Sequence, residues 1–123
     1  MTLHLIGYWG SEPRSGYPDP HDLIDEAWDE EQRWVVASYL DTGTYLRGAL
    51  GLSPCRICAQ PNGSGEYTDG TLAWPEGLAH YVREHSVRLP ASIEEHILRA
   101  FERLQSEALD QDWWAAGSPS PIP

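Results

Sequence analysis

Four residues in the middle of the chain carry side chains that bind transition metals. Cys55 and Cys58 are the only cysteines and have two residues between them, and 21 residues separate Cys58 from His80, which is followed by His85. Two thiolates and two imidazoles can form a tetrahedral S2N2 site, and Zn²⁺ favours such borderline-soft donors. The spacing therefore predicts a Cys2His2 zinc site formed by Cys55, Cys58, His80 and His85.

The spacing of the two histidines places a condition on the helix that carries them. On an ideal α-helix, side chains five residues apart point about 140° away from each other, whereas those four residues apart differ by about 40°. His85 must therefore lie where the helix ends, and the pattern after residue 85 is not helical. Glu84 follows His80 by four residues and is the alternative fourth ligand.

Two zinc chemistries are compatible with these residues. A catalytic zinc ion normally keeps three protein ligands and one open position, so four available ligands favour a closed, structural site. Metal binding would then supply folding free energy to the turn-rich segment 53–90. The alternative is a small zinc-dependent enzyme of hydrolase type, in which Cys55, Cys58 and His80 bind the metal. In that enzyme Glu84 or Glu76 would act as general base.

Three interpretations without a metal remain open. The cysteines could form a redox dithiol, although the Pro61–Gly63 run that follows does not favour the helix such a pair usually precedes. They could form a disulfide, although nothing at the N-terminus indicates an oxidising compartment. They could also be ordinary packed residues, with the two histidines buried or solvated nearby.

The order of a cysteine turn, a hairpin and a helix resembles zinc fingers in the broad sense, closest to treble-clef or Cys2His2-type sites. The resemblance covers Pro54 to Pro90 and implies a structural zinc ion. It departs from DNA-reading fingers, because the interval between cysteines and histidines exceeds their roughly twelve residues. It also places Ala59 where such turns often have glycine. The run Trp74–Val82 resembles small bacterial proteins, from which no activity is carried over.

A hairpin and a helix are expected to bring the histidines to the cysteines. Residues 66–74 are rich in β-formers, and Asp69-Gly70 at their centre predicts a two-residue type I′ turn. Pro75 fits the first position of a helix over 75–85, because its missing N–H costs nothing there.

The remaining pattern predicts a small α+β domain with short strands, a zinc knuckle, a hairpin and about three helices. A strand is expected over 2–9, a helix over 29–41 with Asp29 as N-cap and Gln32 at the capping-box position, and an extended stretch over 45–52. Ser92 with Glu95 predicts a second capping box, opening an amphipathic helix over 92–109. Residues 1–110 form the predicted zinc-stabilised domain, and 111–123 a flexible C-terminal tail.

The net charge of the chain indicates which classes of partner it can bind. The 123 residues carry 8 Lys+Arg against 19 Asp+Glu, a net charge of −11. This balance argues against nucleic acids and anionic membrane surfaces, which need clustered bases. Acidic residues concentrate between positions 22 and 31, a pattern typical of a solvated face or of a docking surface for a basic protein. The residues expected to contact such a partner are Asp25, Glu26, Trp28, Asp29 and Glu30.

The sequence thus predicts a non-enzymatic zinc protein that acts as an acidic protein-interaction module. No run approaches the roughly 20 apolar residues of a membrane span. Residues 1–7 lack the basic and long apolar regions of a secretory signal, which predicts a cytoplasmic protein.

Overall fold

The computed structural model describes residues 1–10, 16–48, 53–117 and 121–122. A four-stranded sheet in the order β1-β4-β3-β2 forms one layer. Its strands are β1 (His4–Leu5), β2 (Thr44–Gly48), β3 (Gly65–Thr68) and β4 (Leu72–Pro75). The β1–β4 pair is parallel, and the other two pairs in this sheet are antiparallel. The expected α+β class is confirmed.

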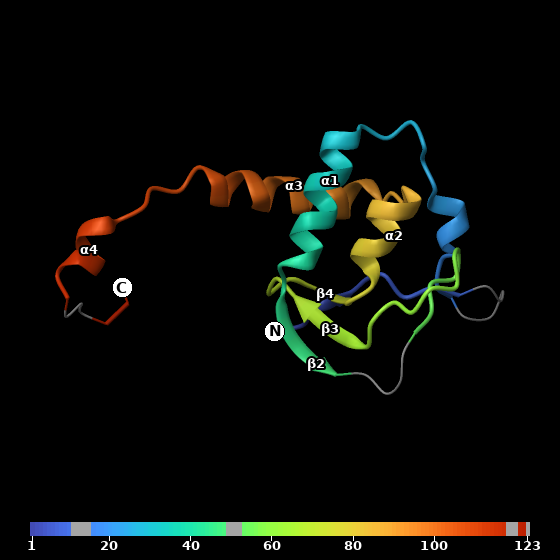
Figure 1. The fold of residues 1–123 in the computed structure, drawn as a ribbon, viewed down its shortest axis with the longest axis horizontal. Helices are drawn as coiled ribbons and strands as arrows, with labels where there is room; N and C mark the ends of the chain where they lie inside the picture. The colour runs from blue at the N-terminus through green and yellow to red at the C-terminus, as the bar shows by residue number, and fades with distance from the viewer. Residues whose placement is uncertain (11–15, 49–52, 118–120, 123) are drawn as a thin grey trace.

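Helices cover one side of this sheet (Figure 1). They are α1 (Glu30–Asp41), α2 (Leu78–His85) and the first half of α3 (Ala91–Gln105), with a 3-10 turn, η1 (Pro20–Leu23), before them. The second half of α3 and a short helix α4 (Gln111–Ala115) extend away from this body (Figure 1). No helix among the described residues is long and apolar enough to cross a membrane.

Trp74 lies at the centre of the core between sheet and helices. Its side chain is fully buried, and its indole Nε1 donates a hydrogen bond to the carbonyl of Leu40 at 3.0 Å. Gly43, which lies between α1 and β2, makes room for the Trp74 ring, because a Cβ at this position would lie 2.6 Å from that ring. The surrounding core is formed by α1, α2 and α3, with Val36, Leu40, Leu78, Val82 and Ile97 fully or almost fully buried.

Local hydrogen bonds explain where α1 begins and where the hairpin turns. The side chain of Asp29 accepts from the backbone N–H of Gln32 at 2.9 Å, which confirms the predicted N-cap. The predicted type I′ turn is wrong. Three residues separate β3 from β4, and only Gly70 among them has a positive φ. Asp69 instead accepts from the N–H groups of Thr71 and Leu72, an arrangement that leaves its own backbone unstrained.

The predicted starts of the other two helices are also wrong. Pro75 belongs to β4 and pairs with β3, and α2 begins only after Gly77. The predicted capping box at Ser92 is absent, because α3 already begins at residue 91. The carbonyl of Pro90 accepts from two backbone N–H groups at 3.0 Å, so Pro90 is the N-cap.

Three further boundaries differ from expectation. The first strand comprises two residues of the eight expected, and α3 ends at residue 105 rather than 109. The predicted tail contains α4, which begins where the side chain of Asp110 accepts from the N–H of Trp113 at 3.1 Å. The domain boundary at residue 110 stays a prediction. Residues 49–52 of the expected extended stretch lie outside the described residues.

Candidate metal centre

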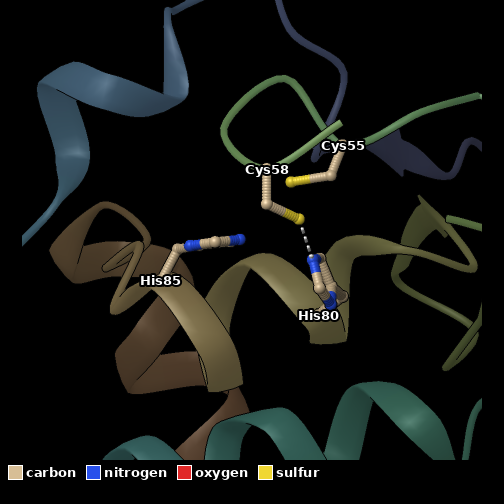
Figure 2. A group of neighbouring side chains, drawn as sticks. All are labelled: Cys55, Cys58, His80 and His85. Atoms are coloured by element: carbon tan, nitrogen blue, oxygen red, sulfur yellow. Dashed lines mark hydrogen bonds between the residues drawn. The ribbon is translucent and has the colours of Figure 1, made fainter. Parts of the chain in front are cut away.

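The four predicted ligands lie together, although they come from two separate elements. Cys55 and Cys58 lie on a tight turn before β3, and His80 and His85 lie on α2 (Figure 2). One potential ligand atom from each residue lies within 4.8 Å of the other three. No other group of three or more histidine, cysteine or acidic side chains in the described part of the chain could hold a metal ion in this way.

Backbone hydrogen bonds fold residues 55–60 into a knuckle that presents both sulfurs on one side. The N–H of Ala59 donates to the carbonyl of Cys55, and the N–H of Cys55 donates to the carbonyl of Gln60, both at 2.8 Å. The N–H of Ile57 points at the sulfur of Cys55 at 3.4 Å. Ala59 has a φ of +63°, the left-handed conformation that explains why glycine is common at this place.

Tyr81 lies on α2 and joins this helix to the knuckle by a hydrogen bond. Its hydroxyl accepts a hydrogen bond at 2.8 Å from the backbone N–H of Arg56, the residue after the first cysteine. Cys55, Tyr81 and Val87 form a small buried cluster of their own, against which Trp9 packs. Burial is the main cause that raises the pKa of the Tyr81 hydroxyl, so this group stays neutral at ordinary pH. Tyr81 was not predicted from the sequence, because its proximity to the knuckle depends on the tertiary fold.

His85 lies at the C-terminal end of α2, as the spacing of the two histidines requires. His85 is the last residue of the helix, and Ser86 after it has the left-handed φ of 54°. The side chain of Arg33 from α1 donates to the carbonyl of Arg83 at 3.1 Å and to the hydroxyl of Ser86 at 3.0 Å. These contacts fix the end of the helix. The imidazole of His85 consequently faces that of His80, with ring centroids 5.0 Å apart.

His85 is the most informative member of the group. Its Nε2 atom is buried and has no hydrogen-bond partner among the described residues. Burial is the main cause that lowers the pKa of His85, and the nearby His80 adds to the effect. The imidazole is therefore neutral at pH 7, which is the form that binds metals. A buried, unpaired nitrogen costs about 1–3 kcal/mol, and a metal ion at this point would remove that cost.

The distances fit a tetrahedral zinc ion. Zn–S and Zn–N bonds of about 2.3 and 2.0–2.1 Å place neighbouring ligand atoms about 3.3–3.8 Å apart. The sulfur of Cys58 and Nε2 of His80 are 3.4 Å apart, within that range. The remaining ligand-atom separations are at most 4.8 Å, which exceeds the bonding range by no more than about 1 Å. The residues present therefore fit Zn²⁺ without a change of fold.

The two acids predicted as alternative ligand or base lie outside this group. Glu84 is exposed on α2 and is not among the four convergent residues. Glu76 precedes α2, and its carboxylate accepts a hydrogen bond from the backbone N–H of Ser64 at 3.1 Å.

The residues predicted to contact a partner have different environments. Glu26, Asp29 and Glu30 are exposed, and Asp29 also caps α1. Asp25 forms an ion pair with Arg88 at 2.9 Å, which lowers the pKa of its carboxyl. Trp28 is only 5% exposed and belongs to the core. Trp34 on α1, four residues after Glu30, is an exposed aromatic residue, at 63%.

The chain was compared with models of known protein families, with curated proteins and with solved structures, and none matches. The role of the centre is therefore inferred from the residues of this chain alone.

Proposed function

We propose that the protein is a non-enzymatic zinc protein in which a closed Cys2His2 site fastens the knuckle to α2. The observation that carries this proposal is the convergence of four ligand atoms within 4.8 Å, where the buried Nε2 of His85 has no hydrogen-bond partner among the described residues. A complete set of four protein ligands leaves no position for a reacting water, which favours a structural ion over a catalytic one. The exposed position of Glu84 supports the same conclusion.

A structural ion has a clear task in this fold. Within the knuckle only Cys55 is buried, so the segment contributes little apolar area to the core. The backbone hydrogen bonds of the knuckle are mainly internal, and the bond from Arg56 to Tyr81 joins it to α2. Structural zinc sites contribute on the order of 10 kcal/mol to the folding of such small segments. The ion would therefore hold together two elements that packing alone joins weakly.

We further propose that the exposed acids around the start of α1 dock a basic protein. Glu26, Asp29 and Glu30 are solvent-exposed, the exposed Trp34 lies about one helical turn after Glu30 on α1, and the whole chain carries −11. Negative potential around an exposed aromatic anchor favours fast and selective association with a positive surface. Trp28 is buried in the core and is therefore not part of this surface.

Hydrogen exchange with and without a chelator tests the zinc proposal. Zinc removal should accelerate amide exchange in residues 53–63 by at least tenfold, because the knuckle loses its main attachment. The amides of α1 in the separate main core should change much less. Equal protection of residues 53–63 in both samples would contradict a structural role for the metal.

Charge-neutral variants test the docking surface. A protein with Glu26→Gln, Asp29→Asn and Glu30→Gln loses three charges, and asparagine is as good an N-cap for α1 as the aspartate it replaces. The control carries Glu102→Gln, Glu107→Gln and Asp112→Asn, which removes three exposed charges elsewhere. Titrated with an arginine-rich peptide, the first variant should bind at least several-fold more weakly than the control. Equal weakening of both would show only a general charge effect.

A further inference from the structure

A cavity of about 400 Å³ lies beside the knuckle and shares no residue with the four metal ligands. Its walls come from segments far apart in sequence, namely residues 7–9, 53–54, 56, 62–65 and 75–77, together with Tyr81. This volume falls in the range of small-molecule sites, about 300–1,000 Å³.

Aromatic rings form much of the wall. Tyr8, Trp9 and Tyr81 all line the cavity, and the rings of Trp9 and Tyr81 contact edge to face with centroids 5.4 Å apart. Burial, and then the nearby Glu66, raise the pKa of Tyr8 to about 12, so its hydroxyl is neutral. Aromatic walls of this kind favour a planar apolar body.

Two side chains of opposite charge complete the lining. Arg56 is exposed at the cavity, and no ion pair found among the described residues involves its guanidinium. Glu76 uses one carboxylate oxygen to accept from Ser64 and keeps lone pairs for a second donor. A guanidinium binds a carboxylate well, and a carboxylate binds an ammonium group.

The segment around Glu76 is closely packed and holds its side chain in place. A Cβ at Gly63 would lie 2.3 Å from a Glu76 carboxylate oxygen, and a Cβ at Gly77 would lie 2.3 Å from the carbonyl of Asn62. The amide of Asn62 also donates to the carbonyl of Gly77 at 3.1 Å. The backbone contact requires glycine at position 77, and Gly63 has the left-handed φ of +81°, so the fold fixes the backbone of this wall.

These features together select the charge type of the ligand. A polyanion would be repelled by Glu76 and by the net charge of −11, and a simple cation by Arg56. A zwitterion satisfies both side chains. We infer that this cavity binds an aromatic α-amino acid, with its carboxylate on Arg56, its ammonium group near Glu76 and its ring against Tyr8, Trp9 and Tyr81.

The cavity and the metal centre share the knuckle. Arg56 lies between the two cysteines, so the metal ion would fix the backbone that carries it. Zinc removal should therefore weaken ligand binding, and the ligand should strengthen zinc binding by the same factor. Only this coupling between the two sites rests on the proposed function.

Three probes with the same indole ring separate the charge contributions. The first is L-tryptophan itself. The second is tryptamine, which lacks the carboxylate, and the third is indole-3-propionate, which lacks the ammonium group. Calorimetric titration of the full zinc-loaded chain should give an affinity for L-tryptophan at least tenfold above that for either analogue. Equal binding of all three probes, or no binding of any, would overturn the assignment.

Two variants locate the charges within the cavity. Arg56→Gln should reduce L-tryptophan binding to the level of tryptamine, and Glu76→Gln to the level of indole-3-propionate. The control variants Arg103→Gln and Glu102→Gln alter residues outside the cavity and should bind as the wild type does. Unchanged binding by both cavity variants would contradict the inference. Metal content is measured on each sample: a chain that takes up no zinc from excess zinc and still binds L-tryptophan selectively would refute the metal proposal and leave the cavity assignment standing.

Discussion

The substitution His85→Leu distinguishes a metal ligand from a packed histidine, because the two cases predict opposite changes in the stability of the protein. Leucine has a similar size and favours helices, so the substitution mainly removes the buried nitrogen. If Nε2 simply lacks a partner, as it does among the described residues, its removal should stabilise the protein by about 1 kcal/mol. If zinc binds there, the same substitution removes one of four ligands and destabilises the zinc-saturated protein.

The magnitude of that destabilisation follows from mass action. Even residues that only orient a ligand change metal affinity by 10–100-fold, so loss of a direct ligand should cost about 100-fold or more. At saturating zinc, a hundredfold loss of affinity lowers the free energy of unfolding by about 2.7 kcal/mol. Set against the gain of about 1 kcal/mol from removing the buried nitrogen, the net loss is about 1.7 kcal/mol, so the midpoint of thermal unfolding should fall by roughly 6 °C for a chain of this length.

Urea unfolding in the presence of a thiol reductant, once in excess zinc and once in excess chelator, measures the change in the free energy of unfolding with and without the metal. We expect His85→Leu to gain about 1 kcal/mol in chelator and to lose about 1.7 kcal/mol net in zinc, because the loss of about 2.7 kcal/mol from weaker zinc binding is partly offset by that gain. Glu84→Gln, the exposed neighbour, is the matched control and should change neither value by more than about 0.5 kcal/mol. A His85→Leu protein that is more stable than wild type in zinc would refute the assignment of this residue as a ligand.

Three further substitutions test the surrounding structure by urea unfolding. Ala59→Gly should stabilise by up to about 1 kcal/mol, because φ is +63° there, and a destabilised variant would contradict that conformation. Burial raises the pKa of Asp69, but hydrogen bonds led by that from Tyr39 outweigh it and lower the pKa to about 2. A lowered pKa stabilises the fold above the unfolded value and loses this effect as pH falls toward 2, so Asp69→Asn should cost about 2 kcal/mol at pH 7 and flatten the stability profile between pH 5 and 2. An unchanged profile would be the contrary result. Trp74→Phe should cost about 2–3 kcal/mol, since it leaves the carbonyl of Leu40 unpaired and a void in the core, and a neutral effect would contradict the buried hydrogen bond.

The candidate ligands and the fold class could be predicted because their signals are local. Two cysteines with two residues between them define one turn, and the histidine spacing required a helix that ends at His85, as it does. The N-cap at Asp29 depends on hydrogen bonds within one turn of chain, and it was also predicted correctly.

The errors arose where distant contacts outweigh local preference. Asp69 was expected in a two-residue turn, but its carboxylate also bonds to Tyr39 at 2.6 Å and to His96 at 2.9 Å, which favours a wider loop. Pro75 was expected in a helix, but the N–H of the next residue continues the sheet by bonding to Gly65 at 2.7 Å. The burial of Trp28 likewise depends on the assembled core.

X-ray absorption at the zinc edge, together with metal content per chain, tests the closed Cys2His2 site directly. The protein would be purified without an affinity tag or added metal. We expect close to one zinc per chain, bound by two sulfurs at about 2.3 Å and two nitrogens at about 2.0–2.1 Å. A chain without metal and with two freely titratable thiols, or a zinc ion with an oxygen in its fourth position, would contradict a closed Cys2His2 site.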